Sequence, residues 1–218
     1  MQLDENLNVV VPVVTERVTR KEKDADGKEK EVTEEVVKVY AFHTPISKAV
    51  FDANFRILAA TKSALESKGT QYLMSAGPRI AALTLRDEGL RDAESRGNVD
   101  DNGRPKANEV QALFAEFRRL TMVLCSSPRG WDMVPVDQAI SGGVIDSEDW
   151  EEAEAALVFF TCHYSMAKKA SRARIAQATA SLLRASITPS SLSEYLASLQ
   201  RSTPAATSGA KAESSVPS

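Results

Sequence analysis

The first forty residues alternate or cluster their hydrophobic positions as strands do. Valines dominate residues 9–14 and 32–39, and Asp26-Gly27 lies between these two runs. Asp-Gly suits the positive φ that the tightest hairpin turns need at both central positions. The sequence therefore predicts a long β-hairpin over residues 8–42. Pro12 cannot donate a hydrogen bond to a sheet, so we expect it on an edge strand or facing outward.

The predicted hairpin has an apolar base and a charged tip. Nine charged residues flank the expected Asp26-Gly27 turn, at positions 20–24 and 28–31. An isolated two-stranded ribbon is marginally stable in water. We therefore expect an arm whose base is covered by its own helices, by a second copy of the chain or by a bound client.

After residue 43 the apolar residues recur every three or four positions, which predicts helices. Thr44 as N-cap and Pro45 at the first helical position predict a helix over residues 44–68. Gly77-Pro78 predicts a kink or break within 71–93. Asp146 or Ser147 is expected to cap an acidic helix start. The other predicted helices cover residues 108–124, 135–141, 148–167, 170–185 and, more weakly, 191–200.

These elements predict a mainly α fold: a helical, bundle-like body with an N-terminal β-hairpin and a disordered C-terminal tail. The expected parts are an arm over residues 1–43, a helical domain over 44–201 and a tail over 202–218. The tail is rich in Ser, Thr, Ala and Pro, and such a segment buries too little apolar surface to offset its ordering entropy.

Composition narrows the classes of function. The 218 residues are 43% hydrophobic, and the net charge of -3 argues against a general nucleic-acid binder. We expect no membrane partner, because no apolar run approaches the length of a spanning helix, and no secretory signal, because the first residues are acidic. Cys125 and Cys162 are expected as reduced thiols rather than as a disulfide.

Several residue groups suggest chemistry, and each has a simpler structural explanation. Residues 98–109 match the spacing of a calcium-binding EF-hand loop, but Asn98 begins it, and Pro105 and Lys106 disfavour it. Cys162 and His163 are neighbours, so on a helix their side chains diverge rather than converge as a nucleophile and base would. The acidic cluster at 148–154 suits a helix start, and the basic cluster at 168–174 a helix end. We therefore predict no catalytic residue, cofactor or metal.

Large apolar residues near the end of the body are the best candidates for contact with a protein partner. Most are expected in the core, but some are expected to face outward, where exposed apolar groups mark partner sites. The predicted partner-binding residues are Trp131, Met133, Trp150 and Phe159.

Four features of the chain resemble tail assembly chaperones of long-tailed bacteriophages. The hairpin passes into Phe42-His43-Thr44-Pro45-Ile46, and an Ala-rich helix follows. The other two features are the block Trp131-Asp132-Met133-Val134-Pro135-Val136 and the helix start Ile145-Asp146-Ser147-Glu148-Asp149-Trp150. The order of a compact helical body and a Ser/Ala/Pro tail is also similar, and the likeness extends over most of residues 8–201.

This resemblance implies a non-enzymatic protein that acts in the host cytoplasm. Members of the family bind the tape-measure protein, keep its long apolar helices in solution and help to recruit tail-tube subunits. Many also exist in a longer form made by ribosomal frameshifting. The alternative hypothesis is a structural virion component, such as a tail-completion or connector protein, retained in the particle. Self-association through the hairpin is a further expectation, and an enzyme or calcium sensor is a third, weaker one.

Overall fold

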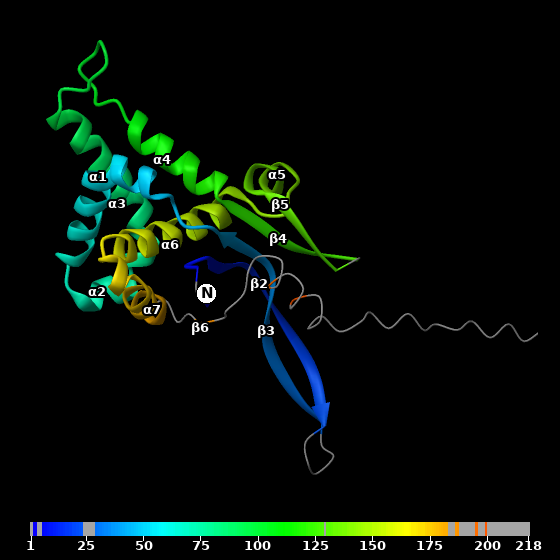
Figure 1. Cartoon of the computed structure of the whole chain (residues 1–218). Helices are drawn as coiled ribbons and strands as arrows, with labels where there is room; N and C mark the ends of the chain where they lie inside the picture. The colour runs from blue at the N-terminus through cyan, green and yellow to red at the C-terminus, as the bar shows by residue number, and fades with distance from the viewer. Residues whose placement is uncertain are drawn as a thin grey trace, which may run out of the picture.

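The computed structural model describes residues 2–3, 6–23, 29–128, 130–182 and 186–187, together with Tyr195 and Leu199. A group of helices lies at one end of a sheet whose longest hairpin projects away from the body (Figure 1). The expected Asp26-Gly27 turn and the expected tail over 202–218 lie outside the described residues, as does most of the predicted helix 191–200.

Within the described residues, the sheet has six strands in the order β5-β4-β3-β2-β1-β6. Every neighbouring pair is antiparallel except β1 and β6. The prediction of a mainly α fold was therefore wrong, because the protein combines helices with a sheet that extends well beyond the hairpin. The strands are β1 (Gln2–Leu3), β2 (Val9–Lys23), β3 (Glu29–His43), β4 (Thr121–Ser127), β5 (Gly130–Pro135) and β6 (Ser186–Ile187).

The predicted helix 108–124 is two elements. Helix α4 covers Asn108–Arg119, and β4 begins at Thr121 and pairs with β3 from Val39 to His43. The segment Thr-Met-Val-Leu-Cys can satisfy either a helical or a strand pattern. Pairing with β3 decides in favour of the strand, since it buries Val123 and Leu124 on opposite faces of one sheet.

The helices otherwise follow the sequence pattern closely. The break at Gly77-Pro78 is confirmed, because one helix ends just before it and the next begins at Gly77. The Asp146 cap is also confirmed. The Asp146 side chain accepts a hydrogen bond from the Asp149 backbone N–H, and the Asp149 side chain accepts one from the Asp146 backbone N–H. Ser47, rather than Thr44, caps the first helix. The helices are α1 (Lys48–Glu66), α2 (Thr70–Ser75), α3 (Gly77–Ser95), α4 (Asn108–Arg119), α5 (Val136–Ser141), α6 (Ser147–Ser165), the 3-10 turn η1 (Lys169–Ser171) and α7 (Arg172–Leu182).

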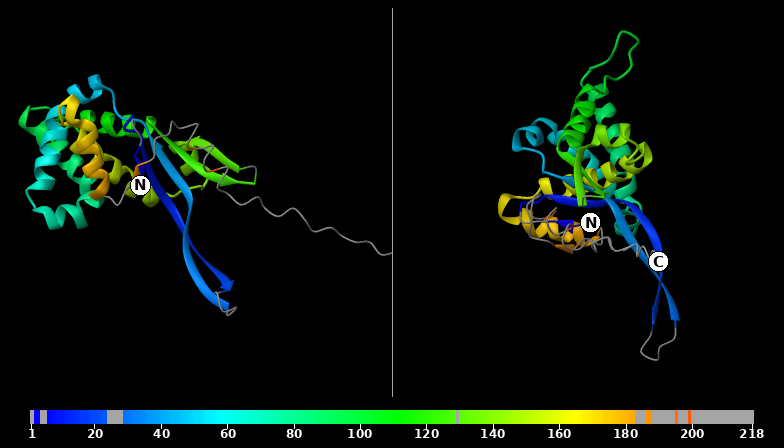
Figure 2. Two further views of the ribbon diagram at one scale, coloured as in Figure 1. Left: turned by 60° about the horizontal axis from the view of Figure 1, so that its bottom comes forward. Right: turned by 90° about the vertical axis from the view of Figure 1, so that its right-hand side faces the viewer.

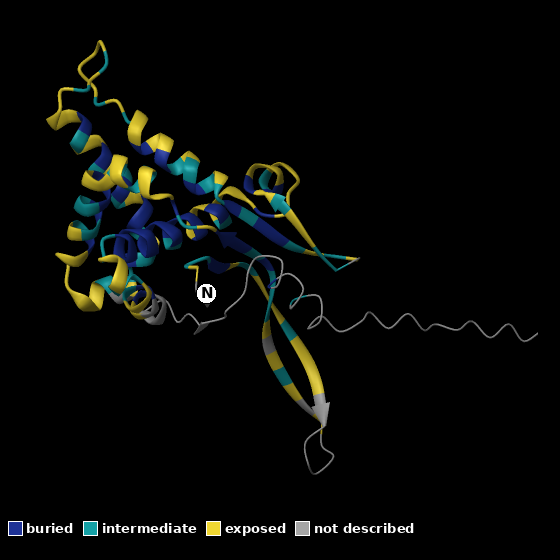
Figure 3. Cartoon of the chain, in the orientation of Figure 1, coloured by how far each residue is buried: buried dark blue, intermediate teal, exposed yellow. Residues whose placement is uncertain are grey.

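Helix α6 forms the centre of the core. Nearly all of its residues from Trp150 onward are buried, and it contacts α1, α3, α4, α7 and β2 (Figure 3). The main core also takes one face of the sheet, through Val9, Val11, Val39, Ala41 and Val123. A smaller apolar cluster lies on the other face. The sheet is therefore apolar on both sides.

The hairpin β2–β3 is where the sequence predicted it. Its base belongs to the body, because β3 pairs with β4 and β2 packs on α6. Its distal part projects away from the other elements in every view (Figures 1 and 2). Pro12 is exposed and adjoins a register shift between Pro12 and Thr15. Residues of the hairpin base and residues of the helices thus contribute to one core.

Candidate functional site

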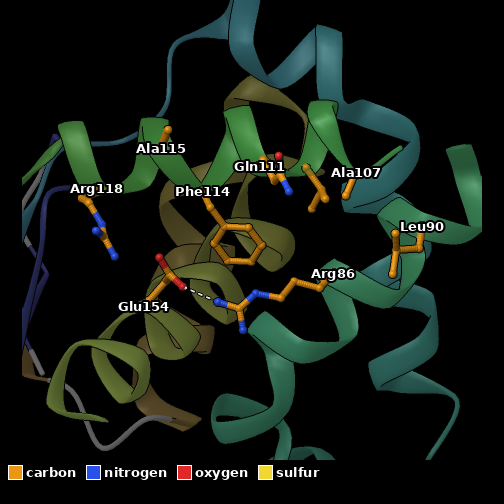
Figure 4. A pocket seen from close by; sticks show the side chains of 9 residues that line it. Arg86, Leu90, Ala107, Gln111, Phe114, Ala115, Arg118 and Glu154 are labelled. Carbon is orange, nitrogen blue, oxygen red and sulfur yellow. Dashed lines mark hydrogen bonds and ion pairs between the residues drawn. The ribbon is translucent and has the colours of Figure 1, made fainter. Parts of the chain in front are cut away.

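A pocket of about 470 Å³ opens between α3, α4 and α6 (Figure 4). Its walls are mostly apolar, and two arginines lie at its edge. Figure 4 shows the Phe114 ring at the middle of the pocket, between Arg86 and helix α4. The lining residues are Arg86, Leu90, Ala107, Val110, Gln111, Phe114, Ala115, Arg118 and Glu154.

A buried carboxylate anchors the floor of this pocket. Glu154 is 3% exposed, and each of its oxygens accepts a hydrogen bond: one from Trp150 Nε1 at 3.1 Å, the other from Arg86 Nη2 at 3.0 Å. Burial raises the pKa of Glu154, whereas Arg86 and Trp150 lower it. Because both oxygens are engaged, Glu154 holds α3 against α6 and orients Arg86.

The two arginines each lie against an aromatic ring. The Arg86 guanidinium carbon is 4.6 Å from the Phe114 ring centre, and that of Arg118 is 5.7 Å from the Trp150 ring centre. Arg118 also donates to Asp137 at 2.9 Å. A guanidinium has five N–H donors, so both arginines retain donors for a ligand. The pocket can therefore take an apolar side chain on its wall and a hydrogen-bond acceptor at its edge.

A second hollow, of about 640 Å³, lies on the other side of α4, against α1. Small residues line it: Ala49, Ala53 and Ala112. At its rim Arg96 donates two hydrogen bonds to Glu109, at 2.8 and 2.9 Å. Small side chains between two helices leave room for a third. Helix α4 thus has a concave, partly apolar surface on each flank.

Trp131 and Met133, two of the four predicted partner-binding residues, lie on strand β5. Met133 is 43% exposed, and the Trp131 ring is 5.5 Å from that of Tyr40. They belong to the outer sheet face, the face turned away from the main core. Its members are Val10, Tyr40, Phe42, Met122, Leu124, Trp131 and Met133.

Tyr195 packs on the outer sheet face from a distant part of the chain. Its ring is 6.0 Å from that of Tyr40 and 6.5 Å from that of Phe42, and Leu199 contacts the same cluster. Tyr195 is buried, and burial raises its pKa and that of Tyr40. The C-terminal part of the chain therefore covers some of this face.

The other two predicted contact residues lie in the core. Trp150 is 2% exposed and Phe159 is fully buried, so neither presents surface to a partner in this conformation. Both follow the helical spacing that also marks core residues, and the sequence does not separate these two roles. The pocket itself was missed, because Arg86, Phe114 and Glu154 come from three helices whose packing the sequence does not reveal.

The histidines and cysteines serve packing in this structure. His163 Nδ1 is 2.7 Å from the Phe159 carbonyl oxygen, and its ring lies on that of Phe159. Burial raises the pKa of the neighbouring Cys162 thiol to about 12, which disfavours the reactive thiolate. Cys125 is partly buried on β4, and burial raises its pKa also.

The loop with EF-hand spacing folds on itself. Asp100 accepts hydrogen bonds from the backbone N–H groups of Asn102 and Arg104, and Val99 bridges to Pro105. Glu109, at the position of the last calcium ligand, is paired with Arg96. Over the described ranges, no group of three or more His, Cys, Asp or Glu side chains is placed to hold a metal ion.

The charged clusters at the two ends of α6 also have local partners. Asp149 completes the capping box with Asp146, and Glu152 lies 3.6 Å from Arg79. After α6, Arg172 donates to the Ala167 carbonyl oxygen at 3.2 Å. The capping box is the helix-start interaction that the sequence pattern indicated, whereas the Glu152–Arg79 pair joins α6 to α3.

Comparison with known proteins adds no relative: no family model, curated protein or solved structure matches the chain. Among the described residues, no helix is both long and apolar enough to cross a membrane.

Proposed function

We propose that this chain is a tail assembly chaperone of a long-tailed bacteriophage. It binds apolar segments of the tape-measure protein reversibly in the host cytoplasm and helps to bring tail-tube subunits to them, without catalysing a reaction. The proposed clients come from the sequence resemblance. The two concave surfaces that flank α4 are the proposed places where these clients bind.

The observation that carries the proposal is the pocket between α3, α4 and α6. Its volume, about 470 Å³, suits one or two side chains of an amphipathic helix. Phe114, Val110 and Leu90 offer apolar contact, and Leu90 remains 38% exposed at the edge. Arg86 and Arg118 offer donors to carboxylate or carbonyl groups of the same helix. An apolar wall beside retained donors recognises a segment that is part apolar and part polar.

A co-expression experiment tests the proposal. The tape-measure reading frame is expressed alone, with the wild-type chain, and with the Leu90→Glu variant. We expect the wild-type chain to keep the tape-measure protein in the soluble fraction. Leu90→Glu should reduce that fraction several-fold, because an apolar helix that covers the pocket edge would strip water from the carboxylate. Leu83→Glu is the matched control, since Leu83 is exposed on the same helix and does not line this pocket.

Tape-measure protein that stays insoluble with and without the wild-type chain would refute the chaperone proposal. Equal loss of solubility with Leu90→Glu and Leu83→Glu would instead remove this pocket from the binding site. Circular dichroism of both variants establishes that each is folded.

The projecting arm favours one other function, a structural virion component such as a tail-completion or connector protein. An arm with long exposed strands suits permanent pairing with neighbouring subunits. The two functions differ in where the protein is found after assembly. Mass spectrometry of purified particles should not detect a chaperone, whereas a stoichiometric amount in the particles would support the structural alternative.

A further inference from the structure

The projecting arm has two open edges. Beyond Val10, β2 pairs only with β3, and from Glu29 to Lys38 β3 pairs only with β2, within the residues that the structure describes. Backbone N–H and C=O groups on an unpaired edge can bond to another strand. The arm therefore offers one edge from each strand over about ten residues.

These two edges carry opposite charge. Residues 15–23 of β2 include four basic and two acidic side chains, a net charge of +2, whereas residues 29–38 of β3 include four acidic and two basic, a net charge of -2. Attraction between the two strands of one hairpin requires only that each pair of facing residues has opposite charges. Strands that each carried equal numbers of basic and acidic residues could meet this requirement equally well. Because β2 is net basic and β3 is net acidic, the edge of β2 in one copy attracts the edge of β3 in another. Two β2 edges, or two β3 edges, repel each other.

The register of the hairpin puts the opposite charges face to face. Arg17 is paired with Glu35 and Lys21 with Glu31, with Thr19 and Thr33 between them. The Arg17 Nε atom is 3.4 Å from the Glu35 carboxylate, and both side chains remain exposed. Exposed side chains such as these can interact both with their partners within the hairpin and with a strand that is added at the open edge.

We infer that the arm joins copies of this chain head to tail, with β2 of one copy lying antiparallel along β3 of the next. In the register of the hairpin itself, Arg17 and Lys21 of one copy then face Glu35 and Glu31 of its partner. Symmetric pairing of β2 with β2, or of β3 with β3, would instead oppose like charges, which is destabilising.

The opposite face of the arm agrees with this arrangement. Val18, Val32 and Val36 share that face and are half-buried. Since Val18 is paired with position 34, it lies diagonally between Val32 and Val36, and the same spacing recurs when β2 comes from a second copy. A head-to-tail contact leaves one edge of each kind free, so it builds a closed ring or an open filament.

A charge-swapped chain tests the inference without disturbing the hairpin. The variant carries Arg17→Glu, Lys21→Glu, Glu31→Lys and Glu35→Lys, so both cross-strand pairs keep opposite signs. Wild-type and swapped chains are given different affinity tags. Each is examined alone by light scattering over a concentration series at low salt, and the two are then co-expressed and purified through one tag.

We expect each chain alone to reach a mass of two or more copies, and added salt to shift the association to higher protein concentration. In co-expression, the purified species should contain one type of chain, because β2 of the wild type and β3 of the swapped chain are both basic. Mixed species would overturn the inference, since symmetric β2–β2 pairing would favour them. A mass of one chain at every concentration would also overturn it. Neither outcome depends on client binding, so the proposed function is tested separately.

Discussion

His43 shows how one residue can couple stability to pH. It is the last residue of β3 and is buried, with its ring stacked on that of Phe117 from α4 at a centre-to-centre distance of 5.5 Å. Its Nδ1 atom is 2.9 Å from the Thr121 hydroxyl, which itself donates to the Phe117 carbonyl oxygen. The Thr121 proton is thus already used, so Nδ1 carries the ring proton and donates it to Thr121. The other ring nitrogen, Nε2, is buried and has no hydrogen-bond partner among the described residues, which suits a neutral imidazole.

Acid should therefore destabilise the fold through His43. Burial lowers the pKa of His43 from 6.5 to about 3, so between these values the unfolded chain takes up a proton that the folded chain does not. The resulting stability is present above pH 6.5 and is lost as the pH falls, by roughly 3 kcal/mol at pH 4. We expect urea denaturation of His43→Gln to show a shallower decline over this range than that of the wild type. Parallel declines would contradict the assignment, whatever the stability of the variant at neutral pH.

At the scale of elements, one glycine allows α3 and α4 to touch. A Cβ atom added at Gly89 would lie 2.6 Å from Val110 Cβ, closer than carbon atoms approach without displacement. Val110 lines the proposed client pocket, so this contact also sets the width of the pocket. Glycine is therefore required at position 89 by the closeness of α4, and the helical conformation of α3 does not itself require it.

The Gly89→Ala variant tests that contact by the sign of its effect. Inside a helix, this exchange ordinarily stabilises a protein by about 0.5–1 kcal/mol. Here we expect a loss of about 1–3 kcal/mol in the free energy of unfolding, because the core is close-packed and α4 must move. Chemical denaturation measures the difference. A more stable variant would mean that the two helices are not held at this distance.

Elements were predictable wherever one local signal determined them. The valine runs gave the long hairpin, Gly77-Pro78 gave the break between α2 and α3, and Asp146 gave the start of α6. Strand β4 was missed because Met122, Val123 and Leu124 continue the apolar spacing of α4. Only pairing with β3, about eighty positions earlier in the chain, separates the two. The same long-range packing assembles the pocket, which no local pattern reveals.

At the scale of the whole molecule, the sheet needs cover on both faces. Helices cover one face, and on the outer sheet face Tyr195 lies against Tyr40 and Phe42. This contact joins positions about 150 residues apart, which is why a sequence pattern could not predict it. Trp131, on the edge strand β5, is partly buried against the same cluster, with its ring 5.5 Å from that of Tyr40.

Removal of the C-terminal part should therefore uncover an apolar surface. We expect a chain ending at residue 190 to lose about 3 kcal/mol of unfolding free energy, comparable to truncation of a large buried aromatic side chain, and to bind the dye ANS more strongly. A chain ending at residue 201 keeps Tyr195 and Leu199 and is the matched control, with the stability of the full chain. The Tyr195→Ala substitution should reproduce most of the loss, because its ring makes the contacts with Tyr40 and Phe42. Equal stability of the two truncated chains would show that Tyr195 does not hold this face in solution, and the outer sheet face would then be open to a partner.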